Sequence, residues 1–197
     1  GDRERALLQS GYPAYTTSAG WLGYSDDKVR SLTREAMRQG LDYIKIKVGR
    51  DLADDKKRCK AVRDEIGPNR NLMIDANNRW TAFEAIRFGH MVEKYNPYWF
   101  EEPVEADDFA GSAHIRRALS IPVASGENEF TRWGARDLIQ ANAVDILQCD
   151  TVLAGGISEG RKIASLASAH HIPVSPHGSP HMAVHLLASL PNAQIME

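Results

Sequence analysis

The chain has 197 residues and a net charge of −2, and 43% of its residues are hydrophobic and 25% charged. This is the composition of an ordinary globular domain that can bury a substantial core. The nearly neutral charge gives no indication of nucleic acid or of an anionic membrane surface as a partner. With no 18-residue apolar stretch and no evident signal peptide, a cytoplasmic protein is expected. Cys59 and Cys149 lie in unrelated contexts and predict neither a disulfide nor a metal site.

Residues 1–12 start charged and helical and end at Gly11, and we interpret them as the end of a preceding segment. From residue 13 onward, β-prone apolar stretches alternate with helical stretches. Strands are predicted at 14–19, 43–48, 71–75, 98–101, 122–125, 145–148, 172–175 and 193–196. Helices are predicted at 25–40, 52–66, 82–95, 109–119, 132–142 and 155–170, and a last one ends at 190.

Strict alternation of strand and helix predicts an α/β domain with a parallel sheet. Eight strands favour a TIM-type (β/α)7β barrel over residues 13–197, with its chemistry at the carboxyl ends of the strands. The first strand is not followed by a Gly-x-Gly-x-x-Gly motif, which argues against a doubly wound dinucleotide-binding fold.

Two lysines, Lys45 and Lys47, occupy alternate positions of a short apolar run. Side chains alternate between the two faces of a strand, so both ammonium groups point the same way. Because burying an unpaired charge is costly, this face is expected to open to water or to an anionic group.

Acidic residues follow the next three predicted strands, namely Asp75, Glu101 and Glu127. They are spaced by 26 residues each, one βα unit, so they are expected at similar height on neighbouring strands. Three converging carboxylates repel one another strongly, and a hard cation such as Mg²⁺ offsets that repulsion. The alternative is that each acid is a solvated strand end or a helix N-cap. The common spacing and the nearby lysines favour the metal site.

Asp150 and His177 lie 27 residues apart, at the ends of adjacent predicted strands. A carboxylate beside an imidazole orients the ring for general acid or base catalysis, whereas the alternative is an ordinary surface histidine. Lys47 is a candidate for a second base, with Lys45 holding an anionic oxygen of the substrate. Two bases around a metal-bound carboxylate suit abstraction of the proton α to that carboxylate, and the metal and nearby cations stabilise the enediolate.

Several motifs together carry a resemblance to a known family. They are Lys45-Ile46-Lys47, Ile74-Asp75-Ala76-Asn77, Phe100-Glu101-Glu102-Pro103, Gly126-Glu127-Asn128, Asp150 and Pro176-His177. On these motifs, residues 13–197 resemble the mandelate racemase subgroup of the enolase superfamily, whose enzymes use Lys or His bases with Mg²⁺. The resemblance implies that Asp75, Glu101 and Glu127 are the Mg²⁺ ligands.

The resemblance also implies roles for the remaining candidates. Lys47 matches one base, assisted by Lys45, and His177 with Asp150 matches the other. Asn77 resembles a polar contact on the substrate side, and Glu197 an acid that hydrogen-bonds the substrate carboxylate or the intermediate. The stretches 12–18, 21–27 and 75–80 are similar to fuconate dehydratases, whereas 175–190 is more like other acid-sugar dehydratases.

We therefore expect an Mg²⁺-dependent hydro-lyase, a dehydratase that converts a sugar acid to a 2-keto-3-deoxy acid. One alternative is a racemase or epimerase of a 2-hydroxy acid that uses the same two bases. Another is a catalytically silent barrel that serves as a binding or assembly module. The expected partner is a small-molecule sugar acid, with no nucleic acid and no membrane, and the resemblance implies a homo-oligomer.

Family members carry an N-terminal capping domain and a C-terminal segment that close over the barrel, and this chain contains neither. We expect the chain to be the barrel part of a longer protein, the alternative being a barrel-only protein. Because a lid excludes water and positions the substrate, slow turnover or none is expected for the chain by itself.

Overall fold

The computed structural model describes residues 1–197, apart from the side chain of Arg3. The chain divides into two compact units, which are described separately. The larger unit comprises Tyr15–Ser125 and Gln140–Asp145. The smaller unit comprises Gly1–Ala14, Gly126–Ile139 and Ile146–Glu197.

The larger unit contains a parallel sheet whose strands are hydrogen-bonded in chain order. Its strands are β1 (Thr16–Gly20), β2 (Tyr43–Lys47), β3 (Asn71–Asp75), β4 (Pro97–Glu101) and β5 (Val123–Ser125). Lys47 pairs with Asp75 between β2 and β3, and Asp75 pairs with Glu101 between β3 and β4. The register therefore brings three of the predicted site residues to one edge of the sheet, and the pairing of Asp75 with Glu101 agrees with their 26-residue spacing.

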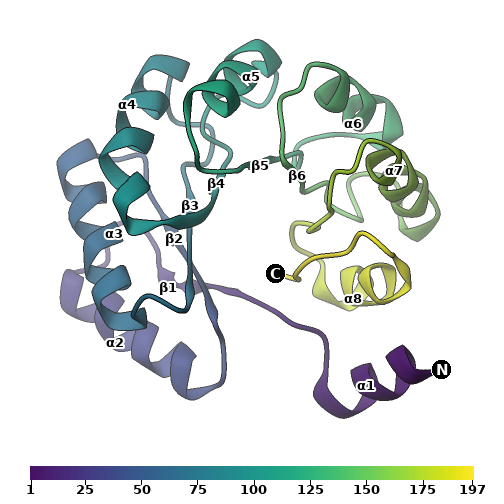
Figure 1. Cartoon of the computed structure of the whole chain (residues 1–197), viewed down its shortest axis with the longest axis horizontal. Helices are drawn as coiled ribbons and strands as arrows, with labels where there is room; N and C mark the ends of the chain where they lie inside the picture. The colour runs from purple at the N-terminus through teal and green to yellow at the C-terminus, as the bar shows by residue number, and fades with distance from the viewer. The chain divides into compact units, whose positions relative to one another are not determined.

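Helices cover one face of this sheet (Figure 1). They are α2 (Asp26–Arg38), α3 (Leu52–Ile66), α4 (Ala82–Val92) with the 3₁₀ turn η1 (Glu93–Tyr95), and α5 (Phe109–Ala118). Ser25 and Thr81 accept a backbone N–H at the start of α2 and α4, and Thr81 forms a capping box with Glu84. Asp51 and Asp108 cap α3 and α5 in the same way, so local sequence signals decide where these helices begin.

The two faces of β2 differ in character. Ile44 and Ile46 are fully buried in the apolar core, which also holds Trp80, Phe88 and Phe100. The rings of Phe88 and Phe100 lie 4.7 and 5.9 Å from that of Trp80. The intervening lysines of β2 face away from this core, as period-two alternation requires.

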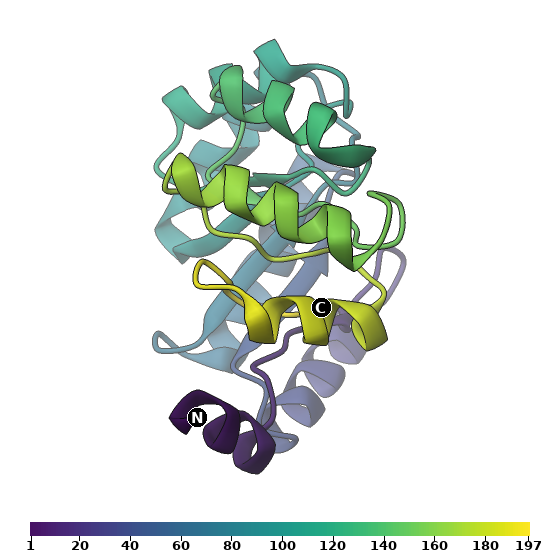
Figure 2. The same cartoon turned by 90° about the vertical axis from the view of Figure 1, so that its right-hand side faces the viewer.

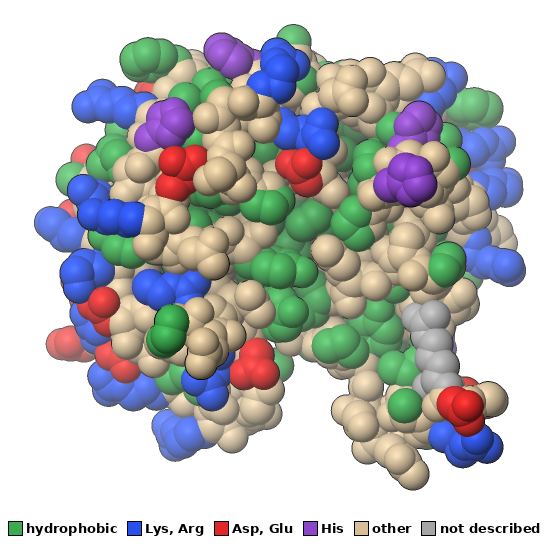
Figure 3. Space-filling view, viewed as in Figure 1, with side chains coloured by type: hydrophobic (Ala, Val, Ile, Leu, Met, Phe, Trp, Pro, Cys, Tyr) green, Lys and Arg blue, Asp and Glu red, His purple; other side chains and the backbone are tan. Residues whose placement is uncertain are grey.

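Charged side chains gather on the outer flank of α2 and α3 (Figure 3). Arg34 of α2 donates two hydrogen bonds to Glu65 of α3, at 2.7 and 2.8 Å, and Arg30 donates a third at 3.0 Å. The hydrogen bonds from Arg34 and Arg30 lower the pKa of Glu65 to about 2. Salt bridges thus connect α2 and α3 on the side that faces water.

The smaller unit holds α1 (Asp2–Ser10), α6 (Thr131–Gln140) except for its last residue, β6 (Ile146–Leu147), α7 (Ile157–Ala169) and α8 (Pro180–Ser189). In Figure 2, α7 lies above α8. Val174 forms isolated parallel bridges with Leu147 and with Ala193, and Met196 forms one with Ala14. The predicted strands 172–175 and 193–196 are thus reduced to single bridges. Pro173 lies within the first of these stretches, Pro176 and Pro191 flank the two stretches, and proline has no N–H to donate to a ladder.

Most predicted elements are confirmed, and α3 and β3 have the predicted bounds. The helix predicted to run to residue 142 ends at Gln140, and the predicted strand 145–148 shortens to Ile146–Leu147. The parallel α/β sheet is confirmed, while the closed (β/α)7β barrel and the boundary between 1–12 and 13–197 stay predictions. Among the described residues, no helix has the length and apolar character needed to cross a membrane. Cys59 and Cys149 are both buried free thiols, as expected.

Candidate active site

The ammonium group of Lys45 lies inside the larger unit, surrounded by polar partners. Its side chain is fully buried, and Nζ donates to Glu101 Oε1 at 2.6 Å. The Tyr15 hydroxyl lies 3.3 Å away and an oxygen of Asp75 3.6 Å away. The charge of Lys45 is therefore neutralised by two carboxylates rather than exposed to solvent.

Lys47 lies two residues further along β2 and closer to solvent. Its Nζ forms an ion pair with Asp75 Oδ2, and its side chain remains 10% exposed. The ammonium group also lies 5.4 Å from the centre of the Trp21 ring. Of the two amines, Lys47 is therefore the one that a ligand can approach.

Asp75 and Glu101 are adjacent and fully buried. Asp75 Oδ1 accepts the backbone N–H of Asn77 at 2.9 Å, and Glu101 Oε2 accepts the indole N–H of Trp99 at 2.8 Å. Each carboxylate thus has one oxygen oriented by a neutral donor and one facing a lysine. Two buried acids and two lysines together form a charge-balanced cluster.

The backbone after β3 and β4 is unusual. Asn77 and Asn78 have φ of 45° and 61°, and Glu102 has φ of 43°. Left-handed backbone is uncommon in residues other than glycine, least so in asparagine, and it concentrates at functional sites. The half-buried Asn77 thus adopts this uncommon conformation directly after β3.

His177 is the centre of a second group of acids, in the smaller unit. Its Nδ1 lies 3.5 Å from Asp150 Oδ2. Its Nε2 lies 3.5 Å from Glu127 Oε2 and 3.6 Å from Glu197 Oε2. The imidazole is 36% exposed, so it combines access to solvent with carboxylates near both ring nitrogens.

Backbone donors orient these acids. Asp150 Oδ1 accepts the N–H groups of Val152 and Leu153 at 2.6 and 3.0 Å, which leaves Oδ2 towards His177. Glu197 accepts the N–H of Gly178 at 3.0 Å. The predicted pairing of Asp150 with His177 is thus present as a close approach, and Glu197 joins it.

The predicted site residues are divided between the two units. The larger unit carries Lys45, Lys47, Asp75, Asn77 and Glu101, and the smaller unit carries Glu127, Asp150, His177 and Glu197. Within the larger unit Asp75 and Glu101 are paired as predicted, and within the smaller unit Glu127 lies beside His177. Among the described side chains, no group of three or more His, Cys, Asp or Glu residues is arranged to hold a metal ion as it stands.

The donor chemistry of Asp75 and Glu101 nevertheless fits a hard divalent cation. Mg²⁺ prefers carboxylate oxygens, binds one or two carboxylates and usually keeps several waters. Two fully buried carboxylates on neighbouring strands supply such oxygens, and their register holds them together. The positive charge beside these oxygens comes from the two lysines.

Two polar or aromatic residues near the predicted site were missed by sequence reasoning. Trp21 approaches Lys47 from the loop after β1. Gln148, two residues before Asp150, is 1% exposed, and neither its amide nitrogen nor its amide oxygen has a hydrogen-bond partner. Gln148 lies two residues before Asp150, so in an extended strand both side chains point to the same face, and this spacing was the available sequence signal for Gln148. No sequence signal indicated Trp21.

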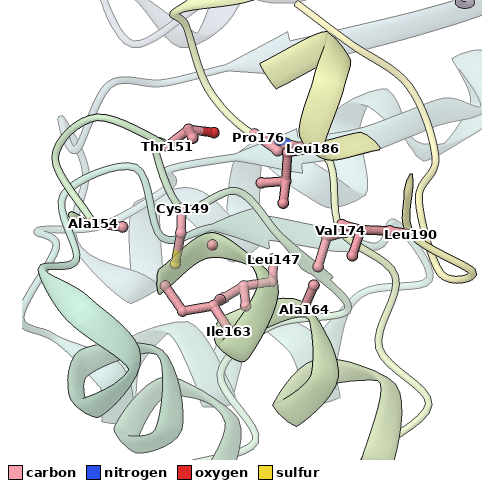
Figure 4. A pocket seen from close by; sticks show the side chains of 11 residues that line it. Leu147, Cys149, Thr151, Ala154, Ile163, Ala164, Val174, Pro176, Leu186 and Leu190 are labelled. Carbon is pink, nitrogen blue, oxygen red and sulfur yellow. The ribbon is translucent and has the colours of Figure 1, made fainter. Parts of the chain in front are cut away.

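A small apolar cavity of about 10 Å³ lies on the other face of β6 (Figure 4). Leu147 and Cys149 reach it from the strand, Ile163 and Ala164 from α7, and Leu186 from α8. Its lining is almost entirely apolar and its volume is that of about one water molecule. This cavity is a packing gap, separate from the polar candidate site.

The chain belongs to the family described as Enolase C-terminal domain-like, whose model matches residues 28–197. Mitochondrial enolase superfamily member 1 of Homo sapiens is 44% identical over 179 residues, which are 89% of this chain and 40% of that protein. L-galactonate dehydratase of Hypocrea jecorina is 38% identical over 192 residues, which are 93% of this chain and 43% of that protein. The chain thus spans less than half the length of these relatives.

Solved structures show the same similarity. A racemase from Streptomyces coelicolor A3(2) with bound magnesium matches with a TM-score of 0.90 and 33% identity, over 94% of this chain and 52% of that one. L-talarate dehydratase from Polaromonas sp. JS666, in complex with Mg and L-glucarate, matches with a TM-score of 0.90 and 33% identity, over 100% of this chain and 58% of that one.

Proposed function

We propose that this chain is the catalytic barrel of an Mg²⁺-dependent acid-sugar dehydratase. The observation that carries the proposal is the charge-balanced cluster in which Lys47, the accessible amine, is paired with a buried carboxylate on the next strand. Membership of the enolase family and the similarity to dehydratases of sugar acids support it.

The proposed metal ligands are Asp75, Glu101 and Glu127. Asp75 and Glu101 support this by their register and burial, and Glu127 by its spacing in the sequence. When bound, Mg²⁺ supplies positive charge that stabilises the negative charge developing on the substrate carboxylate. Lys45 is fully buried, so we assign it an electrostatic role exerted through Glu101 and Asp75.

Lys47 and His177 are the proposed proton carriers. One of them removes the proton from C2 of the sugar acid, which leaves an enediolate. Protonated His177 then gives a proton to the C3 hydroxyl, which leaves as water, and the resulting enol becomes a 2-keto-3-deoxy acid. Asp150 orients the imidazole through Nδ1, and Asn77 and Glu197 are proposed contacts to the substrate.

The chain incubated with Mg²⁺ and a panel of sugar acids, including L-galactonate and L-glucarate, tests this proposal. A semicarbazide-reactive keto acid that forms with Mg²⁺ and disappears with EDTA supports a dehydratase. The matched control is Lys47→Met, which keeps the length of the side chain and removes the amine. Keto acid formed at the wild-type rate by this variant contradicts the assignment.

A racemase or epimerase is the second candidate function, because the same two bases could remove and return the C2 proton on opposite faces. The structural match to a racemase with bound magnesium favours keeping it. Exchange of the C2 proton in D₂O without loss of water identifies this reaction. Loss of water with keto acid formation excludes it as the main activity.

A further inference from the structure

Trp21 stands out among the aromatic residues of the larger unit. It is 48% exposed, in the loop between β1 and α2, and it lies outside the apolar core. Its ring centre is 5.4 Å from Nζ of Lys47, the accessible amine. A large apolar ring held half in solvent beside a candidate base contributes little to core packing.

The loop that carries Trp21 is firmly anchored. The buried guanidinium of Arg58, on α3, donates to the carbonyl of Gly20 at 2.8 Å and to that of Trp21 at 3.0 Å. It also donates to the carbonyl of Tyr24 at 3.2 Å. One side chain therefore fixes three carbonyl groups of this loop.

The same helix anchors the loop that follows Lys47. Asp55 Oδ2 accepts the backbone N–H groups of Gly49, Arg50 and Asp51 at 2.8, 2.9 and 3.2 Å. Arg58 and Asp55 are one turn apart on α3. Helix α3 therefore fixes both the loop that carries the indole of Trp21 and the loop that follows Lys47.

We propose that Trp21 is a substrate-positioning residue whose indole face forms an apolar wall beside the Lys47 amine. The ligand class is an open-chain sugar acid, whose C–H groups pack against the ring while its hydroxyl groups are hydrogen-bonded elsewhere. The indole N–H adds one donor for a substrate hydroxyl. This inference rests on the proposed function, since it concerns the substrate of the same site.

Three variants test the role of Trp21 in the full chain with Mg²⁺. Trp21→Ala removes the wall, Trp21→Phe keeps a ring without the N–H, and Trp133→Phe is the matched control. Trp133 is also half-exposed, at 54%, but it packs against Arg132 and Arg136 on α6. The probes are L-galactonate and L-glucarate, followed by tryptophan fluorescence and by calorimetry.

The wild type is expected to change its fluorescence on binding, because ligand replaces water at the exposed ring of Trp21. Most of this change is lost in Trp21→Phe, where any remainder comes from Trp99 beside Glu101, and all of it persists in Trp133→Phe. Trp21→Ala is expected to weaken binding about tenfold, a typical value for loss of one good aromatic contact. Where turnover is measurable, KM rises by a similar factor and kcat changes less than about twofold, the pattern of lost positioning.

The outcomes separate this inference from the proposed function. If the wild type binds no sugar acid of the panel used to test the proposed function, the proposed function fails and the inference falls with it. If wild type binds and Trp21→Ala binds equally well, only the inference is overturned. Should Trp21→Ala not fold, Trp21→Phe decides by itself, because a fluorescence change as large as that of the wild type in this variant places the ligand away from Trp21.

Discussion

Replacing Lys45 with methionine removes a buried positive charge and leaves the shape of the side chain nearly unchanged. Lys45 is fully buried, 2.6 Å from Glu101 Oε1 and 3.6 Å from Asp75, and both carboxylates are fully buried as well. In the variant these acids keep only Lys47 as a nearby lysine in the cluster. The substitution therefore tests whether the cluster depends on charge balance.

The expected loss in free energy of unfolding is about 3–5 kcal/mol, the usual result of removing one partner of a buried ion pair. Lys47→Met is expected to cost less, about 2 kcal/mol, because its amine is partly exposed and has a single carboxylate partner. In the double variant Lys45→Met with Glu101→Met, most of the loss disappears, since no uncompensated charge remains in that pair.

Urea unfolding at neutral pH, followed by circular dichroism with EDTA present, measures these differences. Mg²⁺ should then raise the midpoint of Lys45→Met more than that of the wild type, because the cation replaces the missing charge. A Lys45→Met variant within about 1 kcal/mol of wild type without metal would refute the argument that this pair neutralises buried charge.

Three further predictions concern packing, pH and chemistry. Gly20→Ala should lower stability by about 1–3 kcal/mol, because the new Cβ would lie 2.3 Å from Cγ2 and 2.7 Å from Cα of Ile46; a urea midpoint equal to wild type contradicts this contact. Glu65 has a pKa of about 2 in the folded chain, below its usual value. Its salt bridge with Arg34 should therefore add about 1 kcal/mol to the free energy of unfolding above pH 4.5, and this contribution should disappear as the pH falls towards 2. Glu65→Gln should flatten this part of the stability profile, and an unchanged acid limb argues against the assignment. His177→Asn should reduce keto acid formation by about 10²–10⁴-fold while the Mg²⁺-induced shift in melting temperature persists, since the histidine is assigned to proton transfer and not to the metal. Turnover within a factor of about ten of wild type is incompatible with that role.

Local sequence signals were sufficient for most of the secondary structure. The caps at Ser25, Asp51 and Thr81 place three helix starts, and each acts within three residues of chain. Period-two alternation along β2 correctly predicted that Lys45 and Lys47 share a face. Prolines within or beside the predicted strands 172–175 and 193–196 were the local signal that those strands would be reduced to single bridges, and the prediction did not use it.

The sequence by itself determined which residues carry the candidate chemistry. It also determined that Asp75 and Glu101 lie side by side, because parallel strands that are one βα unit apart end at the same edge of the sheet. Only the tertiary structure decided that Lys45 is sealed against Glu101 while Lys47 stays accessible. It also decided that Trp21 lies beside that amine and that Glu127 and Glu197 lie beside His177. These contacts join residues 20 or more positions apart, and their partners are chosen by how loops and strand ends pack, which no local pattern encodes.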